Sequence, residues 1–540
     1  MSSISLQEKD KQDALTVQVP NYEEEYEKFK ALSKKYQGDV LGKLLRKIDC
    51  RLVPVFALLY LMSFLDRGNV GNAKVAGLTK TIPMTDKQYN TALSLFFVFY
   101  IVFEIPSQMM LKKFRPKWYI SCLTLSWGLV MSLTCLIQSY RGFMAARSFL
   151  GITESGLFPA AGYTLSMWYS RSEMASRVAL FFCAASVAGA LSGILAYGIS
   201  FMDGLAGMEG WRWIFLVEGL MTIVLGLLGP FIILDSTAYC GKWLSDEEKN
   251  FLILRQRYTE TGPVPPAEHF DWKYVKMAFT DWQMIFQIGI FVTHGALGIL
   301  FCLSWINLIS MILRFEVIPS LVRDFIVTPG GKFPADSFHA VTLPVIIKSL
   351  EFTTYESYLI PVPIYIAACV LTYFNSWWGD RRRSRFLHIV IPFTGAITGV
   401  TICFATAGRT HIAGVNLFGL ILIVFASYSP VPTSISWMAN NVIGYKKVIA
   451  MGMLMGIGNC SGLIGSNIYL TSESPKYQTG YGVSLALAAM GITCAIVLKI
   501  VYARENKSRD LLTVEDIARD WDDKKLADAA DRSPYFRYII

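Results

Sequence analysis

The chain has 540 residues, of which 53% are hydrophobic and only 17% are charged, whereas ordinary soluble domains carry roughly 25% charged residues. The apolar residues gather in blocks of about twenty, the length that spans a hydrocarbon core of about 30 Å. A soluble globular fold is therefore excluded, and a lipid bilayer is the expected solvent. The net charge of +9 does not indicate a nucleic-acid partner, because the basic residues lie mostly in short tracts between apolar blocks, where they orient membrane proteins.

The cysteines do not indicate a disulfide-stabilised fold, and the first fifty residues do not indicate a cleavable signal peptide. The ten cysteines are scattered, with no CxxC pair and no histidine spacing suited to zinc, so no disulfide framework, metal or other cofactor is expected. Residues 1–50 are polar and lack the apolar core of a signal peptide, so the first spanning helix is the expected insertion signal. Residues 21–48 fit either an amphipathic helix on the inner membrane face or a solvated linker.

Twelve apolar blocks follow in chain order. They lie at residues 52–72, 91–111, 119–137, 143–168, 178–201, 213–234, 283–312, 358–376, 387–406, 412–432, 449–470 and 482–502. A polar stretch divides them into a six-helix bundle at 51–235, a cytoplasmic linker at 236–281 and a second six-helix bundle at 282–502. The sequence predicts an all-α membrane protein with 12 transmembrane helices. In such an arrangement the two bundles rock about a site near the bilayer midplane.

Lysine and arginine in alternate loops predict the orientation, because positive charge is held on the cytoplasmic side. With the N-terminus inside, the inner loops carry Lys112, Lys113, Arg115, Lys117, Arg171, Arg177, Arg381, Arg382, Arg383, Arg385, Lys446 and Lys447. The outer loops contain fewer such residues. Both termini are therefore expected in the cytoplasm, with residues 1–50 as one tail and residues 503–540 as a second, charged and largely disordered tail.

An anomalous segment at 313–342 does not fit this pattern. Within it, residues 314–340 read RFEVIPSLVRDFIVTPGGKFPADSFHA and separate the seventh apolar block from LPVIIKSL, with charges and prolines unlike those of the other short loops. Two explanations stay open. The segment is either an unusual outer loop with no special role or an unremoved intron that has been translated, and sequencing the transcript distinguishes them.

Asp66 and Arg67 adjoin near the outer end of the first block. Ionisable residues in a spanning helix cost roughly 2.5 to 3.5 kcal/mol each, so they usually mark a pathway or a paired structural site. These two side chains point about 100° apart around the helix axis, so they cannot face one partner. In one interpretation Arg67 faces the cavity as a cation for an anionic substrate, while Asp66 neutralises it or bonds another helix. The alternative is a structural ion pair at the helix end.

Arg147 and Glu154 lie seven residues apart in the fourth block, on one face of the helix two turns apart. A cation and a carboxyl group on one stripe can hold a substrate and a proton at different times. A buried carboxyl group that loads and releases a proton near neutral pH would couple transport to protons. The structural alternative is that Arg147 caps the outer leaflet and Glu154 bonds a neighbouring helix.

Other polar residues within the blocks have weaker assignments. Glu104 in the second block precedes a proline and a basic run, and it is expected to pair with a loop arginine in an inner gate or to serve structure alone. Glu218 in the sixth block is equally open. The second half offers hydrogen bonds more than charges, from Asn440, Asn441, Asn459, Asn467 and His294. These groups serve either substrate orientation or ordinary bonding between helices.

No catalytic motif is present. The sequence lacks GxSxG, HExxH and Walker motifs, and it has no GxGxxG after a strand, so neither an enzyme nor a self-contained ATP-driven pump is expected.

Several segments resemble the anion:cation symporters of the major facilitator superfamily, in particular the fungal branch of allantoate, nicotinate and vitamin permeases. The matching segments are KIDCRLVP, YLMSFLDRGNVGNAKVAGL, FEIPSQMMLKKFRPKWYI, RSFLGITESGLFPAAGY, WYSRSEMASRVALFF, GWRWIFLVEG, LPVIIKSL, WWGDRRRSRF and WMANNVIGYKKVIAMGMLMGIGNCSGLIGSNIY. They cover residues 47–500. The resemblance departs around residues 303–342, where the family's seventh helix would run directly into the equivalent of LPVIIKSL.

The resemblance implies the major facilitator fold and proton-coupled symport of a small organic anion, a carboxylate nutrient, by a monomer in the plasma membrane. Arg67, Arg147 and Glu154 match the family's substrate and coupling positions. The candidate sites are completed by Asn69, Asn441 and Asn459 for substrate, Asp66 for coupling, and Glu104, Lys113, Asp380 and Arg381 for gating, the last three in or beside the loops KKFRPKW and GDRRRSRF. A receptor that keeps the fold without transporting is the rival hypothesis. The sequence does not select among nicotinate, allantoate, vitamins and similar solutes.

Overall fold

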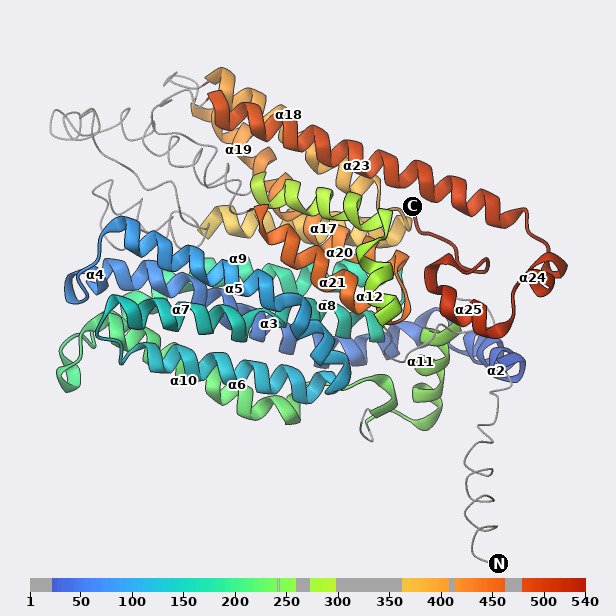
Figure 1. Cartoon of the computed structure of the whole chain (residues 1–540), viewed down its shortest axis with the longest axis horizontal. Coiled ribbons are helices and arrows are strands. Elements are labelled where there is room, and N and C mark those ends of the chain that lie inside the picture. The colour runs from blue at the N-terminus through green and yellow to red at the C-terminus, as the bar shows by residue number, and fades with distance from the viewer. Residues whose placement is uncertain are drawn as a thin grey trace, which may run out of the picture.

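The computed structural model describes residues 22–239, 241, 243–258, 272–297, 362–406, 413–461 and 478–540. The anomalous segment at 313–342, the LPVIIKSL segment and Asn467 lie outside the described residues. The described chain consists of helices and their connections (Figure 1). Six of its helices are long and apolar enough to cross a membrane. The total of twelve spans stays a prediction, because parts of the second half are outside the described residues.

The first half consists of long helices that pack lengthwise. Their bounds are α3 (Asp39–Val75), α5 (Asp86–Lys113), α6 (Pro116–Thr134), α7 (Tyr140–Glu154), α8 (Leu157–Trp168), α9 (Met174–Ser200) and α10 (Gly210–Ile232). α6 packs along α10, and α3 packs along α9. Small residues permit this close packing: a Cβ atom on Gly128 of α6 would lie only 2.8 Å from the backbone nitrogen of Ile223 in α10.

The second half repeats this construction. Its helices are residues 282–297, α17 (Val362–Arg382), α18 (Leu387–Thr406), α19 (Ala413–Tyr428), α20 (Pro430–Asn441), α21 (Gly444–Asn459) and α23 (Gln478–Asp510). The halves meet where α9 packs on α17 and where α5 packs on α21. These two contacts join helices that are far apart in the sequence.

Two predicted spanning blocks are broken helices. The block at 143–168 divides at Gly156 into α7 and α8, and a Cβ atom there would overlap the Ser107 hydroxyl. The block predicted at 412–432 continues to Asn441 and divides at Ser429 into α19 and α20. Proline at 430 has no backbone N–H to donate, so the helical hydrogen-bond ladder is interrupted there. The next helix begins at 444, earlier than the predicted 449.

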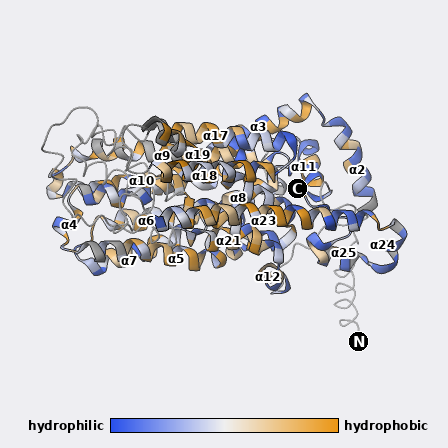
Figure 2. Cartoon of the chain, turned by 90° about the horizontal axis from the view of Figure 1, so that it is seen from above, coloured by the Kyte–Doolittle hydropathy of each residue, from blue (hydrophilic) through white to orange (hydrophobic). Residues whose placement is uncertain are grey.

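The shorter helices gather at one end of the bundle, together with the last residues of the chain (Figure 1). We call this end the linker face. Its helices are α2 (Tyr22–Lys35), α11 (Asp246–Tyr258), α12 (Trp272–Phe279), α24 (Val514–Asp520) and α25 (Asp523–Ala529), while α4 (Leu78–Thr81) lies at the opposite end. In Figure 2, hydrophobic colour dominates the long helices and hydrophilic colour dominates α2 and α24. The bundle therefore has the polarity profile of a membrane-embedded body.

For residues 21–48, one of the two predictions is a helix on the inner membrane face. The structure shows a helix there, α2, but α2 packs on the linker. Tyr36, just beyond α2, stacks on Phe251 of α11 with ring centroids 4.5 Å apart. Glu25 of α2 accepts hydrogen bonds from Tyr258 and Arg257. α2 is therefore held by α11.

The prediction of a largely disordered tail at residues 503–540 is wrong. α23 continues to Asp510, α24 and α25 follow, and the residues after them return to the bundle. Phe536 is fully buried and Tyr538 nearly so. Burial of these two aromatic rings stabilises an ordered conformation of the segment. The charge-rich composition of the segment gave no sign of this burial.

Candidate functional site

An ion pair joins α3 to the end of α7 inside the first half. The Nε atom of Arg67 donates a hydrogen bond to Oε1 of Glu154 at 2.6 Å, and the hydroxyl of Ser63 donates to the same oxygen. Ser63 and Arg67 are four residues apart and so share one face of α3. Glu154 is fully buried, whereas 20% of the Arg67 side chain is exposed. The pair is thus internal, but its cation is within reach of a solute.

Aromatic rings surround the Arg67 guanidinium. Its Cζ atom lies 5.2 Å from the ring centroid of Phe64, 4.9 Å from that of Tyr100 and 5.7 Å from that of Phe96. The faces of these rings attract a cation and exclude water from it. A planar anion that reaches Arg67 would therefore meet both a fork of N–H donors and aromatic surfaces.

Arg147 provides a second cation beside the same ring. Its Cζ atom lies 5.1 Å from the centroid of Phe96. Arg147 and Glu154 both lie on the buried face of α7, as their spacing predicts. The Nε and Nη1 atoms of Arg147 are buried, and neither donates a hydrogen bond to any described residue. Buried donors left without acceptors are costly, and a carboxylate is the natural acceptor for a guanidinium fork.

Asp66 and Asn69 face away from this pair. Asp66 accepts hydrogen bonds from Trp127 of α6 at 2.7 Å and from Thr222 of α10 at 3.3 Å. Asn69 donates to Glu218 of α10 at 2.7 Å. For Asp66, this geometry is the predicted bond to another helix. The structure does not bring either residue to the Arg67–Glu154 pair, and it gives Glu218 a structural partner.

Among the described residues no loop arginine pairs with Glu104, so that one of the two predicted alternatives is wrong for this part of the chain, and the structural alternative stays open. Its side chain is fully buried in α5, where a Cβ atom on Gly456 of α21 would lie 3.3 Å from Oε2. The two residues that act on its carboxyl group are Arg67 and Asn459. Arg115 of the neighbouring loop lies over the ring of Tyr239 instead. Because α5 packs on α21 here, Glu104 and Asn459 mark the contact between the halves.

Asp380 closes the linker face between the two halves. From the end of α17, its carboxylate accepts hydrogen bonds from the backbone N–H groups of Ala175 at 3.3 Å and Ser176 at 2.7 Å, at the start of α9. Arg385 donates to the same carboxylate at 2.6 Å and to the backbone oxygen of Arg171 at 2.6 Å. A carboxylate at a helix N-terminus is stabilised by the helix dipole. This carboxylate is the predicted gating residue that the structure places between the halves.

The remaining candidate residues lie elsewhere. Lys113 and Arg381 are exposed and lie over Phe114 and Trp377, respectively. Asn441 exchanges two hydrogen bonds with the backbone of Ile539, at 2.9 and 2.7 Å. The sequence analysis did not single out Ser63, Tyr100, Arg171 or Arg385. Arg171 and Arg385 lay within the basic loops used to predict orientation, whereas a serine and a tyrosine in an apolar block give no signal on their own. Among the described residues, no cluster of His, Cys, Asp and Glu could hold a metal ion.

Comparison with known proteins places this chain in a transporter class. The model of the Major Facilitator Superfamily matches residues 56–466. An MFS-type transporter of Penicillium expansum, cnsO, is 34% identical over 524 residues, covering 96% of this chain and 94% of that protein. The high-affinity nicotinic acid transporter of Saccharomyces cerevisiae is 28% identical over 469 residues, covering 86% of this chain and 79% of that protein.

Solved structures agree on the fold. The proton:xylose symporter XylE superposes with a TM-score of 0.55 at 12% identity, over 83% of this chain and 95% of that one. The human organic anion transporter MFSD10 gives a TM-score of 0.52 at 14% identity, over 83% and 99%. The chain belongs to the major facilitator superfamily. The predicted fold class is confirmed, and because these relatives are transporters, so is the prediction that the chain is not an enzyme.

Proposed function

We propose that this transporter moves a small organic anion bearing a carboxylate, together with protons, into the cell across the plasma membrane. The observation that carries the proposal is the buried Arg147 guanidinium with unused donors, beside the Arg67–Glu154 pair. The yeast nicotinic acid transporter among the relatives supports a monocarboxylate. The chain works as a monomer in this proposal, with the linker face and both termini in the cytoplasm.

The ion pair suggests how binding and protonation are linked. While Glu154 is ionised it holds Arg67 at 2.6 Å. Protonation of Glu154 weakens this bond and frees the Arg67 guanidinium, which then binds the substrate carboxylate together with Arg147. The substrate therefore binds best when a proton is present, which is the requirement for symport.

The closed contact at Asp380 fits one step of this cycle. The carboxylate bonds to α9 across the halves while the linker face is shut. In the proposal, the site exchanges solute with the opposite side in this state, and rocking of the halves breaks the Asp380 contact to release solute and proton to the cytoplasm.

Uptake of radiolabelled nicotinate by yeast that lacks its own transporter tests the proposal. We expect uptake to rise as the external pH falls, and we expect the Glu154→Gln variant to lose that pH dependence. The matched control is Glu515→Gln, which changes an exposed carboxylate on α24 and should behave as the wild type. Uptake that is independent of pH and unaffected by Glu154→Gln would contradict proton coupling.

A further inference from the structure

Glu104 is a buried carboxyl group that the mechanism above does not use. Its side chain is fully buried, and neither oxygen makes a hydrogen bond to a described residue. Among the described residues, the titratable or charged groups around it are Arg67 from α3, Tyr100 from one turn earlier in α5, and Cys460 after α21. Asn459 is its neutral polar neighbour. Glu104 is therefore at the contact between the halves and within the influence of the site cation.

Glu104 and Glu154 differ in what supports a negative charge. Glu154 has a guanidinium and a hydroxyl donating to it, whereas Glu104 has no donor in hydrogen-bond geometry among the described residues. An ionised carboxylate in a membrane interior is costly unless it is paired. Arg67 carries one positive charge, and it is already paired with Glu154 at 2.6 Å, so it cannot neutralise a second carboxylate as well. The neutral, protonated form of Glu104 is the one that these surroundings accept.

We propose that Glu104 carries a proton in this conformation and serves, with Glu154, as a second coupling carboxyl group. This inference rests on the proposed symport. In this scheme Glu154 takes its proton from water on the outer side before the substrate binds. After the substrate leaves, Arg67 turns toward Glu104, the Glu104 O–H bond breaks, and that proton passes to water on the inner side. When Arg67 returns to Glu154, the Glu154 proton passes to Glu104, so one proton crosses in each cycle. The cation thus decides which of two carboxyl groups is protonated, and the contact of α5 with α21 links that choice to the movement of the halves.

Infrared spectroscopy of purified protein tests the protonation directly and needs no substrate. We expect the C=O stretching band of protonated carboxyl groups at neutral pH to lose intensity in Glu104→Gln. Glu154→Gln should instead lose carboxylate intensity. A protonated-carboxyl band that is unchanged by Glu104→Gln would overturn the inference, whether or not nicotinate proves to be a substrate.

Transport assays provide a second test, because they distinguish a coupling role of Glu104 from a merely structural one. In cells, Glu104→Gln should abolish the accumulation of labelled nicotinate driven by a pH gradient, while loss of the side chain's packing alone would lower accumulation and substrate exchange together. Restoration of pH-driven accumulation by Glu104→Asp supports coupling. Equal loss of accumulation and exchange in Glu104→Gln, with no rescue by Glu104→Asp, argues for a packing role.

A second inference comes independently from residues 530–540, which we call the closing segment. The closing segment contacts both halves at the linker face. Arg171 of the first half donates to the backbone oxygen of Arg537 at 2.8 Å and lies over the ring of Phe536 at 4.3 Å. In the second half, Asn441 and Trp437 bond the backbone of Ile539. One stretch of chain therefore bridges the two bundles beside the Asp380 contact.

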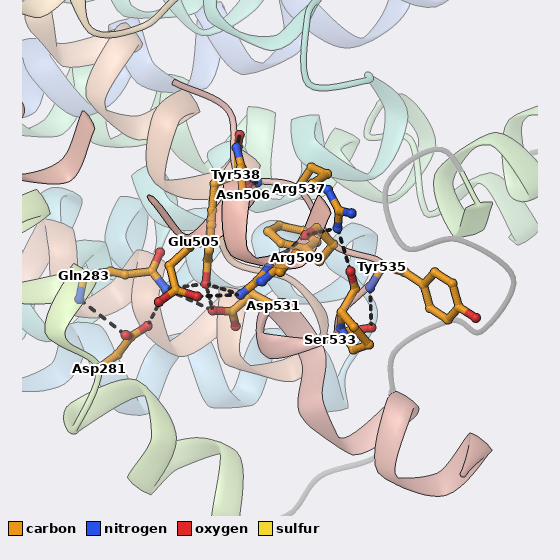
Figure 3. Close-up of polar contacts among 12 residues, drawn as sticks. Asp281, Gln283, Glu505, Asn506, Arg509, Asp531, Ser533, Tyr535, Arg537 and Tyr538 are labelled. Atoms are coloured by element: carbon orange, nitrogen blue, oxygen red, sulfur yellow. Dashed lines mark hydrogen bonds and ion pairs between the residues drawn. The ribbon is translucent and has the colours of Figure 1, made fainter. Parts of the chain in front are cut away.

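A buried ion cluster holds the closing segment in place (Figure 3). Lys446, fully buried at the start of α21, bonds Asp281 at 2.5 Å and Asp531 at 2.9 Å. Gln283 donates to Asp531 at 2.9 Å. The Tyr538 ring stacks on Tyr502 of α23 with centroids 4.6 Å apart. One cation and two carboxylates from three separate parts of the chain thus meet inside the protein, and their ion pairs fix the geometry of the segment.

We infer that the closing segment is a latch that keeps the linker face shut and must detach before the halves open on that side. If the halves opened on this side, Arg171 and Asn441 would move apart. The closing segment is bonded to both residues, so it could not stay attached to both. Detachment exposes Phe536 and Tyr538 to water, which adds an energetic barrier to opening. The latch therefore biases the transporter toward the conformation seen here.

Labelling of a cysteine at the Asp380 contact, beside the latch, tests this inference. Ser176 is 7% exposed at the start of α9, so a Ser176→Cys variant should react slowly with a polar maleimide, followed on that peptide by mass spectrometry. Adding Phe536→Ala and Tyr538→Ala should raise the labelling rate. Tyr535→Ala is the matched control, because its ring points away from the cluster in Figure 3, and it should leave the rate unchanged.

A control for misfolding accompanies the labelling. If the latch variant with both aromatic substitutions loses its cooperative thermal transition, Asn441→Ala, which removes only the bonds to Ile539, takes its place. A labelling rate of the introduced thiol that stays unchanged in a folded latch variant would overturn the inference. An equal rise with Tyr535→Ala would also overturn it, because it would show general loosening instead of release of a latch.

Discussion

Glu154 and Asp66 are both fully buried carboxyl groups, yet their neighbours give them different roles. Arg67 compensates Glu154, whereas Trp127 and Thr222 hold Asp66 between helices. In a membrane interior the partner decides whether a carboxyl group can change its charge. The Arg67 partner of Glu154 is partly exposed, whereas Trp127 and Thr222, which hold Asp66, are fully buried.

Removing the cation of the ion pair should destabilise the protein more than removing both partners. In Arg67→Met, Glu154 remains buried without compensation, and breaking a buried pair in this way costs about 3–5 kcal/mol. In the double variant Arg67→Met with Glu154→Gln, most of that cost should disappear. Thermal unfolding in detergent of the wild type, the two single variants and the double variant measures this double-mutant cycle. Additive losses would show that the two residues do not interact as the structure indicates.

The sequence identified Arg67, Arg147 and Glu154 because charges stand out in apolar blocks. It could not place Asn69 or Glu104, because their roles depend on which helix packs against them. Asn69 is only two residues from Arg67, but that spacing turns it by about 200° toward α10. Glu104 depends on α21, which is more than 300 residues away along the chain.

At the scale of elements, glycines set how closely α5 and α7 pack. A Cβ atom on Gly151 would overlap the backbone oxygen of Phe96, whereas one on Gly198 of α9 would meet no atom within 4 Å. We expect Gly151→Ala to lower stability by about 1–3 kcal/mol. Gly198→Ala should be neutral within about 0.5 kcal/mol. Thermal unfolding of the two variants checks this, and equal effects would contradict the packing described.

The contact of α2 with α11 should weaken in acid. The pKa of Glu25 is lowered, chiefly by the hydrogen bond from Tyr258 at 2.6 Å and also by Arg257. A lowered folded-state pKa stabilises the contact above the group's ordinary pKa of 4.5, and that stabilisation is lost as the pH falls through the lower folded value. Hydrogen exchange should show α2 protected at neutral pH and progressively less protected as the pH falls below the ordinary value of 4.5.

Two variants sharpen this pH test. Glu25→Gln should reduce the protection of α2 already at neutral pH and remove most of the acid response. Glu24→Gln is the control, because the ion pair of Glu24 is within α2, with Lys28, and it should match the wild type. An acid response that persists in Glu25→Gln would assign the effect to another group.

Helix breaks and the ordered tail were not predictable from apolar blocks. Hydropathy is continuous across Gly156, where close approach of Ser107 divides the helix. The charges of residues 503–540 look solvated in sequence, because their partner Lys446 lies some eighty residues earlier. Long, uniformly apolar helices are predictable from composition, whereas the matching of charges across the fold is not.

For the whole molecule, the two halves touch along α9 and α17, and a cysteine lies on each side. The Sγ of Cys183 lies 3.6 Å from the backbone oxygen of Cys369, and the reverse distance is 3.5 Å. Oxidation by oxygen with copper phenanthroline should join these two thiols in a disulfide bond. The halves should then stay together after the linker between α11 and α12 is cleaved, and uptake should be blocked. Cys183→Ala should prevent both effects. A cross-link that leaves uptake intact would contradict rocking at this contact.

The fold class was predictable from the sequence because the lipid bilayer restricts which structures can span it. Apolar blocks of membrane-spanning length, divided into two sets, leave few possible arrangements. The pairings at the contact between the halves, such as Asp380 with the backbone of Ala175 and Ser176, did not follow, because they join segments that are far apart in the sequence.

The most direct test of the central claim is carboxylate binding to the purified protein, followed by thermal stabilisation across a panel of monocarboxylates and their uncharged amides. We predict that at least one carboxylate, with nicotinate first, raises the melting temperature, that its amide does not, and that Arg147→Met abolishes the shift. Stabilisation that survives in Arg147→Met, or that the amides reproduce, would contradict an anion site built on the buried arginines.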